Sequence, residues 1–223
     1  MNNNESKDGY NKILIVTGGS VSEDLLSRHI HSGEYQYIIG VDKGLEALRA
    51  LDVSPDLAVG DFDSADAGIR AMYENSSNAI VLNPEKDYTD THVAVTSAME
   101  LKPEAITLIG ATGSRIDHVL GNLALLKLCL LRGVKLVIED EHNRIYMTDG
   151  KACIRKNDAY GKYVSLIPFS DKVTDINLKG FKYDLENADF VKEETLGVSN
   201  EIREEEGHIS IGDGYLIILE TKD

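Results

Sequence analysis

Two carboxylates follow a short apolar run in the stretch Leu57–Ser64. Asp61 and Asp63 stand two positions apart, so both side chains would point the same way in an extended chain. Carboxylate oxygens are donors that Mg²⁺ prefers, and open α/β sheets bind ligands at the carboxyl ends of their strands. The stretch equally suits a helix entry with Asp63 or Ser64 as the N-cap. It therefore predicts either a metal site or a capped helix.

A second polar stretch, Pro84–Thr91, also follows an apolar run and opens a helical pattern. Lys86 would carry a point charge to phosphate oxygens, while Asp87 and Asp90 add carboxylates. The N-terminus of the following helix would attract anions as well. Capping of that helix by Thr89 or Asp90 is the alternative. Two acidic strand ends in one sheet favour a shared site over coincidence.

A third stretch, Gly110–His118, places glycines and an arginine after another apolar run. The glycines let backbone amides approach a ligand, and Arg115 can form a two-pronged contact with phosphate. Asp117 and His118 enter the first turn of the next helix, where a carboxylate is also an ordinary stabilising choice. Asp42 repeats the arrangement of an aspartate after an apolar run. These segments together predict a phosphate- and metal-binding edge of one sheet.

Composition and missing patterns exclude several other classes of protein. The net charge of -15 would repel a polyanion, and no basic stripe with interleaved aromatics is present, so nucleic acid is not an expected partner. The sequence contains no Walker A pattern, no dinucleotide-binding glycine fingerprint and no His/Cys spacing typical of zinc. An acidic protein that binds ATP must neutralise the triphosphate with carboxylate-held metal ions or a few placed cations.

The chain carries no signal for a membrane or for disulfides. No stretch approaches the ~20 apolar residues that cross a bilayer, and the polar start Met1–Asp8 lacks an apolar signal region. We therefore expect a cytoplasmic protein with no membrane partner. Cys129 lies in an apolar helix-like run and Cys153 in a different kind of segment, so we expect both to be reduced and structural.

The elements that must position these residues follow from the apolar pattern. From Lys12 to about Asp140, short apolar runs alternate with helix-like segments, which is typical of a mostly parallel sheet flanked by helices. The helix at Ile116–Arg132 is apolar on nearly every side, so we expect it to pack against the sheet and other helices. The expected strands are Lys12–Thr17, Tyr35–Val41, Asp56–Gly60, Ala79–Leu82, Ala105–Ile109 and Lys135–Glu139, and the remaining helices are Glu23–His31, Gly44–Leu51, Ala65–Asn75 and Thr91–Leu101.

The pattern changes after Gly150, where no helical period persists. Short β-branched and aromatic runs suggest a smaller antiparallel β domain. With a boundary near 145–155, we predict an α/β domain at residues 1–148 and a β domain at residues 149–223. A β domain of this size is expected to need stabilising contacts with the first domain or with a second copy of itself. The expected strands are Tyr163–Ile167, Lys172–Leu178, His208–Ile211 and Tyr215–Glu220.

The order of the motifs resembles one known family. Asp42-Lys43-Gly44, Gly60-Asp61-Phe62-Asp63-Ser64, Lys86-Asp87-Tyr88-Thr89-Asp90 and Gly113-Ser114-Arg115-Ile116-Asp117-His118 together are similar to thiamin pyrophosphokinases. A weaker likeness continues in Gly180–Leu185 and Leu196–Glu201. The resemblance implies that thiamin and ATP give thiamin diphosphate and AMP, with Mg²⁺ as cofactor. It also implies a homodimer of chains with an α/β and a β-sandwich domain, with thiamin in a cleft between subunits.

The resemblance also implies roles for individual residues. Asp61, Asp63 and Asp90 would hold the metal and triphosphate, with Asp42 nearby. Lys86 and Arg115 would stabilise the transferring phosphates, and Asp117 would orient Arg115 or join the metal network. The remaining residues that the resemblance places at ATP or thiamin are Asp87, Thr89, His118, Ser199 and Asn200.

The thiamin side departs from the family in one respect. Ser199 and Asn200 match the thiamin-side motif, where short polar groups would bind the aminopyrimidine, although a β-turn is their alternative interpretation. The chain has no Trp, and Tyr183 stands where the later motif often has one. A missing indole changes stacking on thiamin but leaves the aspartates untouched.

Two other functions remain as alternatives. A magnesium-dependent phosphohydrolase would use an aspartate after an apolar strand and water as acceptor, but it leaves Lys86 to Asp90 without a role. A non-catalytic sensor of nucleotide or thiamin would keep the pocket without needing so many carboxylates.

Overall fold

The computed structural model describes residues 10–61, 68, 72–73, 76–83 and 87–223. The chain forms two compact units, Met1–Leu136 and Val137–Asp223. The assignment of separate functions to residues 1–148 and 149–223 stays a prediction.

The described strands of the first unit form a parallel arrangement in the order β5-β1-β2-β3-β4. From Ile13 to Val16, every side chain of β1 is 0% exposed. Burial on both faces explains why such strands read as continuous apolar runs. The chain builds outward from β1 through β2 to β4 and then returns to the other side of β1 with β5, so the order reverses between β1 and β5. The strands are β1 (Lys12–Val16), β2 (Tyr37–Val41), β3 (Leu57–Gly60), β4 (Ala79–Val81) and β5 (Ala105–Ile109).

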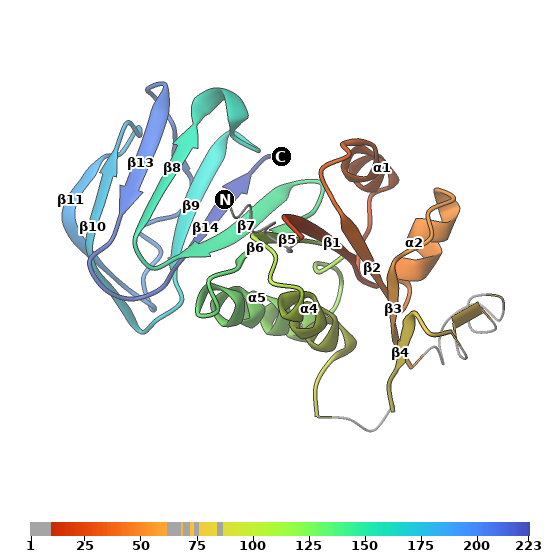
Figure 1. The fold of residues 1–223 in the computed structure, drawn as a ribbon. Helices are drawn as coiled ribbons and strands as arrows, with labels where there is room; N and C mark the ends of the chain where they lie inside the picture. The colour runs from red at the N-terminus through yellow and green to blue at the C-terminus, as the bar shows by residue number, and fades with distance from the viewer. Residues whose placement is uncertain (1–9, 62–67, 69–71, 74–75, 84–86) are drawn as a thin grey trace, which may run out of the picture. The chain divides into compact units, whose positions relative to one another are not determined.

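Helices cover both faces of these strands, with α1 and α2 on one side and α4 and α5 on the other (Figure 1). Ser22 caps the first of them by accepting a hydrogen bond from the Leu25 amide at 3.4 Å. No helix in the described part of the chain is both long and apolar enough to cross a bilayer. Most of the helix expected at Ala65–Asn75 lies outside the described residues. The helices are α1 (Glu23–His31), α2 (Gly44–Ala50), α4 (Asp90–Glu100) and α5 (Ile116–Leu130).

Helix α5 packs against α4, as expected, but part of its apolar surface is exposed. Leu125, Leu126 and Cys129 are buried, whereas Ile116 is 65% exposed and Leu120 is 62% exposed. Apolar composition gives no direction, so the pattern alone could not show which side of the helix stays exposed.

The second unit is built from antiparallel strands in two sheets. One sheet has the order β12-β9-β14-β7-β6 and the other the order β11-β10-β13-β8. Strand β6 (Lys135–Glu139) runs across the division between the units. The other strands are β7 (Asn143–Thr148), β8 (Lys151–Arg155), β9 (Tyr163–Pro168), β10 (Lys172–Lys179), β11 (Leu185–Val191), β12 (Asn200–Glu201), β13 (Glu206–Ser210) and β14 (Leu216–Thr221), with a short 3₁₀ helix, η1, at Lys156–Asp158.

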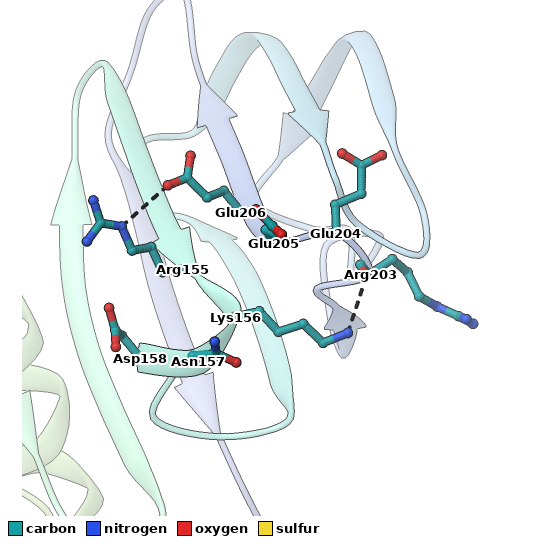
Figure 2. A pocket seen from close by; sticks show the side chains of 8 residues that line it. All are labelled: Arg155, Lys156, Asn157, Asp158, Arg203, Glu204, Glu205 and Glu206. Atoms are coloured by element: carbon teal, nitrogen blue, oxygen red, sulfur yellow. Dashed lines mark hydrogen bonds and ion pairs between the residues drawn. The ribbon is translucent and has the colours of Figure 1, made fainter.

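A charged hollow of about 650 Å³ opens beside η1 (Figure 2). Its polar side chains come from the end of β8, from η1 and from the turn before β13. Arg155 reaches Glu206 across it, with 3.4 Å between Nε and Oε1. Both side chains are well exposed, so this ion pair adds little to stability.

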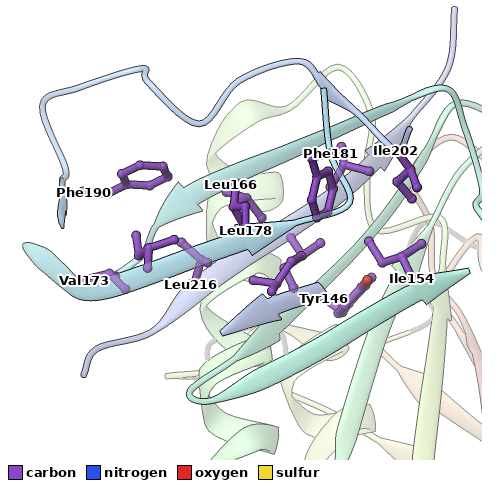
Figure 3. Close-up of a cluster of buried hydrophobic side chains, with 13 residues drawn as sticks. Tyr146, Ile154, Leu166, Val173, Leu178, Phe181, Phe190, Ile202 and Leu216 are labelled. Atoms are coloured by element: carbon purple, nitrogen blue, oxygen red, sulfur yellow. The ribbon is translucent and has the colours of Figure 1, made fainter. Parts of the chain in front are cut away.

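The core of the second unit lies between its two sheets (Figure 3). Along β10, Val173, Ile176 and Leu178 are buried while Lys172 and Lys179 are exposed. This alternation, interrupted by a bulge-like register shift, places one face of the strand in the core. Leu166 and Leu216 from the facing sheet, together with Phe190 from the neighbouring strand β11, fill the remaining space.

Candidate functional site

A cavity of about 440 Å³ lies in the first unit, at the carboxyl ends of β1, β2 and β5. This is the place where the strand order reverses, and open α/β sheets bind their ligands there. The cavity is smaller than the hollow beside η1, but it gathers two of the predicted aspartates, Asp42 and Asp90, together with the glycine loop and Arg115. We therefore assign the functional site to it. Its lining is Thr17–Gly19, Asp42–Lys43, Thr89–Thr91, Gly110–Arg115, His118, Val119 and Asn122.

Two loops that form one wall of the cavity are held together through their backbones. The amide of Gly19 donates to the Gly110 carbonyl at 2.8 Å, and the amide of Ser20 donates to the Thr112 carbonyl at 2.7 Å. A Cβ on Gly19 would come within 2.3 Å of both acceptor oxygens. Only glycine permits this approach, so the loop after β1 is part of the site although its sequence signal is weak.

Three buried polar side chains support the cavity and were missed from the sequence. The hydroxyls of Thr17 and Thr91 are 2.9 Å apart and join the end of β1 to the start of α4. Asn122 donates from Nδ2 to the Ala111 carbonyl at 2.8 Å and so fixes the loop after β5 to α5. A polar residue inside an otherwise apolar run is the signal that could have identified Asn122.

Asp42 and Asp61 follow the neighbouring strands β2 and β3. Asp42 has a left-handed backbone with φ 48°, and its amide donates to the Val59 carbonyl at 3.1 Å. A Cβ on Gly60 would lie 2.3 Å from Asp42 Oδ1, so the Asp42 carboxylate lies directly against the end of β3. Asp61 is half-buried immediately after it. Asp63, the other predicted metal ligand, lies outside the described residues.

The start of α4 brings a second acidic group to the cavity. Thr89 caps this helix by accepting a hydrogen bond from the His92 amide at 3.2 Å, which confirms the capping alternative for Thr89. Asp90 is the first helical residue and its half-buried side chain lines the cavity. Asp87 is exposed and is absent from the described cavity lining, and Lys86 lies outside the described residues.

Arg115 lies just before α5, lines the cavity and forms an ion pair with Asp117. The Arg115 Nη2 atom donates to Asp117 Oδ2 at 2.6 Å, and Nε donates to Oδ1 at 3.3 Å. These hydrogen bonds are the main reason why the pKa of Asp117 falls to about 2. Asp117 is not among the described residues of the lining, so its geometry favours the orienting role over a metal-binding one. His118 is exposed and lines the cavity.

Ser199 and Asn200 belong to the second unit. Ser199 is exposed, with a left-handed backbone, and its amide donates to Ser165 Oγ at 3.0 Å. Asn200 is 7% exposed, and its side chain pairs with both backbone groups of Tyr183: Oδ1 accepts from the amide at 3.1 Å and Nδ2 donates to the carbonyl at 2.8 Å. Asn200 thus holds the backbone of Tyr183, whose ring is 61% exposed.

Comparisons with known proteins agree with this arrangement. A family model described as the thiamin pyrophosphokinase catalytic domain matches residues 31–138, and one described as the thiamin pyrophosphokinase vitamin B1 binding domain matches residues 151–216. Thiamine pyrophosphokinase of Bacillus subtilis (strain 168) is 37% identical over 215 residues, covering 95% of this chain and 99% of that protein. Thiamin pyrophosphokinase 1 of Caenorhabditis elegans is 25% identical and covers 76% of this chain and 71% of that protein.

Solved structures give the same result. A crystal structure of the Bacillus subtilis thiamine pyrophosphokinase has a TM-score of 0.85 at 33% identity and covers 96% of this chain and 100% of that one. The corresponding structure from Geobacillus thermodenitrificans has a TM-score of 0.82 at 34% identity and covers 95% and 98%. The predicted fold class, a mostly parallel α/β arrangement followed by antiparallel sheets, is confirmed. Because two family models match most of the chain and the Bacillus subtilis relative aligns with it nearly end to end, the chain belongs to the thiamin pyrophosphokinase family.

Proposed function

We propose that this chain transfers the pyrophosphoryl group of ATP to the hydroxyl of thiamin and releases thiamin diphosphate and AMP. The observation that carries the proposal is the cavity of the first unit, where Asp42, Asp90 and Arg115 meet at the reversal of strand order. A chain of this family with anionic and cationic groups in one cavity has the means to hold a triphosphate together with its metal.

The donor set around the cavity fits Mg²⁺ as the metal of the reaction. Asp42 and Asp90 supply carboxylates directly, Asp61 follows the adjacent strand, and Asp63 is the fourth candidate. Such hard oxygen ligands suit Mg²⁺. When bound, the ion would neutralise negative charge on the triphosphate and so favour transfer of the pyrophosphoryl group away from AMP.

The remaining groups bind and orient the substrates. The Gly110–Gly113 loop and the N-terminus of α4 would offer backbone amides to phosphate oxygens, while the Gly19 amide holds the loop after β1 to the Gly110 carbonyl. Arg115, kept in one orientation by Asp117, would contact the transferring group with its guanidinium. The thiamin oxygen then bonds to the β-phosphorus as the bond from that phosphorus to the AMP oxygen breaks, and the hydroxyl proton passes to solvent. Positioning and charge stabilisation account for most of such catalysis.

The thiamin side of the site belongs to the second unit in this proposal. Tyr183 offers an exposed ring for stacking on thiamin, and Asn200 fixes the backbone from which that ring projects. Ser199 adds an exposed hydroxyl beside them. We further propose that two chains form a homodimer in the cytoplasm and that each thiamin site combines residues from both subunits.

Product analysis tests the reaction. The purified chain is incubated with ATP, MgCl₂ and thiamin, with controls that lack each component, and the products are separated by chromatography. Thiamin diphosphate and AMP in equal amounts are expected. Inorganic phosphate released without thiamin would instead identify a phosphohydrolase, and tight binding without turnover would identify a sensor.

Mixed dimers test the shared site separately from the reaction. Asp61→Asn and Asn200→Ala chains carrying different tags are co-expressed, and the mixed dimer is isolated through both tags. If each site uses Asp61 of one chain and Asn200 of the other, the mixed dimer has one intact site and should regain about half of the wild-type activity. If each site lies within one chain, every site carries a defect and no activity returns.

A further inference from the structure

The outer face of the four-stranded sheet carries three metal-ligating side chains close together. Cys153 on the edge strand β8 lies directly opposite His208 on β13, and Glu206 stands two residues before His208 on the same strand. One ligand atom from each residue lies within 4.8 Å of the others. This cluster has no part in the proposed reaction, whose candidate aspartates all belong to the first unit.

The strand alternation holds these three side chains on one face. Ile154, Gly207 and Ile209 alternate with them and are buried on the opposite face. Cys153 and His208 are exposed and Glu206 is half-buried. Solvent therefore reaches all three ligand atoms, while the paired backbones fix their spacing.

We propose that Cys153, Glu206 and His208 form a binding site for a borderline-soft divalent transition metal ion, with zinc as the best match. Thiolate sulfur and imidazole nitrogen are ligands that zinc binds well and that Mg²⁺ does not prefer. One thiolate and one carboxylate also neutralise the two charges of the ion. Three protein ligands leave a fourth tetrahedral position for water or another ligand.

The observed spacing needs only a small adjustment to accept the ion. At zinc–ligand distances of about 2.0–2.3 Å, tetrahedral ligand atoms lie roughly 3.5 Å apart. The Nε2 atom of His208 and Oε2 of Glu206 are already 3.4 Å apart. Rotation of the exposed Cys153 and His208 side chains can close the remaining gap without moving the backbone.

Positively charged side chains near the cluster compete with a metal ion for Glu206. Arg155 lies opposite Glu206 and approaches its Oε1 atom at 3.4 Å (Figure 2), which leaves Oε2 facing His208. Lys179 on β10 lies opposite His208, and Lys151 lies opposite Ser210 on the same face. Binding replaces the Cys153 S–H bond by a metal–sulfur bond, and the proton passes to solvent.

Metal binding here would join two strands by their side chains. The edge strand β8 pairs with β13 along five residue pairs, and the ion would bridge the central pair of this ladder and the neighbouring Glu206. An ion that binds only the folded chain raises its melting temperature by mass action. Zinc should therefore stabilise the protein at concentrations where added magnesium has no further effect.

The test uses the full chain, stripped by a chelator and kept in excess Mg²⁺ so that carboxylate-only sites are already occupied. Zn²⁺ binding is followed by competition with a chromogenic chelator, and Co²⁺ replaces it to reveal a sulfur-to-cobalt charge-transfer band. Because Cys129 is 0% exposed within α5, such a band identifies Cys153. We expect one ion per chain, the cobalt–sulfur band and a rise in melting temperature.

Matched variants separate the site from general zinc affinity. Cys153→Ser and His208→Gln should each weaken binding by at least the ~10–100-fold that loss of an outer-shell partner costs, and Cys153→Ser should also abolish the cobalt–sulfur band. His142→Gln and Glu204→Gln, exposed residues of the same unit, should leave both unchanged. Undiminished zinc binding in Cys153→Ser, or a cobalt complex of the wild type without the sulfur band, would overturn the proposal.

Discussion

The two units of this chain place their polar residues in opposite ways. In the first unit, the important polar groups stand at strand ends, where backbone oxygens leave no room for a side chain on Gly19 and a Cβ on Gly60 would press on the Asp42 carboxylate. In the second unit, two sheets enclose a packed apolar core, and polar side chains lie on the outer faces of the sheets. The contrast indicates that substitutions of the polar groups at the strand ends of the first unit act mainly on function, whereas those in the core of the second act mainly on stability.

The largest effect is expected when an aspartate of the first unit loses its charge. Asp61→Asn should lower turnover by ~10²–10³-fold or more, because it removes one electrostatic stabiliser while keeping the side-chain shape. Asp52→Asn is the matched control, since Asp52 is exposed in the turn after α2. Steady-state kinetics and thermal melting measure both variants. An active and well-folded Asp61→Asn protein would remove Asp61 from the mechanism.

Core truncation in the second unit should produce the converse result. Phe190 is 2% exposed within the inter-sheet cluster, so Phe190→Ala should lower the free energy of unfolding by ~3–5 kcal/mol. Tyr183→Ala removes an exposed ring from the same unit and should change that free energy by less than ~0.5 kcal/mol. Its effect should be a lower kcat/KM for thiamin. Denaturant titration compares the two, and equal destabilisation would contradict the proposed division.

A glycine exchange tests whether the strand ends of the first unit are as crowded as the geometry indicates. Gly60→Ala would place a methyl group 2.3 Å from Asp42 Oδ1, and relieving that clash should cost ~1–3 kcal/mol of stability and displace the Asp42 carboxylate. Gly121→Ala is the control: it lies within α5 with no atom within 4 Å of its new Cβ, so it should add ~0.5–1 kcal/mol. Chemical denaturation distinguishes the two signs, and stabilisation by both exchanges would show that the strand end has room.

The smallest effect concerns the ion pair beside the cavity. Asp117 has its pKa lowered to about 2 by the Arg115 hydrogen bonds, so Arg115→Gln should return it toward the ordinary value of 3.8. Because the folded-state pKa is depressed, the contribution of this pair to stability is complete above the ordinary pKa and is lost as the pH falls through about 2. Carboxyl NMR titration measures the shift. Asp189, whose pKa is lowered mainly by Lys172, is the control that should not move.

Much of the first unit could be predicted because its physical signals are local. Strand β5 was expected at its observed bounds, and β1 within one residue, because strands buried on both faces form unbroken apolar runs. Asp42 directly follows such a run and Asp90 begins the helix after another, so both were expected at one edge of a parallel sheet, and both line the cavity. For these residues, residue type and order along the chain are enough to predict which side chains lie at the same edge of the sheet.

The second unit was less predictable because its strands depend on their neighbours. Strand β8 and strand β11, which carries acidic residues at Glu186 and Asp189, were not assigned from sequence. Apart from Ile154 and Phe190, their residues are half-buried or exposed, and each segment becomes a strand through pairing with β13 or β10. Such pairing joins residues far apart in the chain, where local propensity has little influence.

Residue types and their order were thus sufficient for the family resemblance, the fold class and the aspartates of the candidate site. Only the tertiary structure shows that Asp117 accepts hydrogen bonds from Arg115, that Asn200 holds the backbone of Tyr183, and that Cys153 lies opposite His208. The physical reason is that these arrangements depend on side-chain direction and strand register. A one-residue change of register would turn every side chain of a strand to the other face while leaving its composition unchanged.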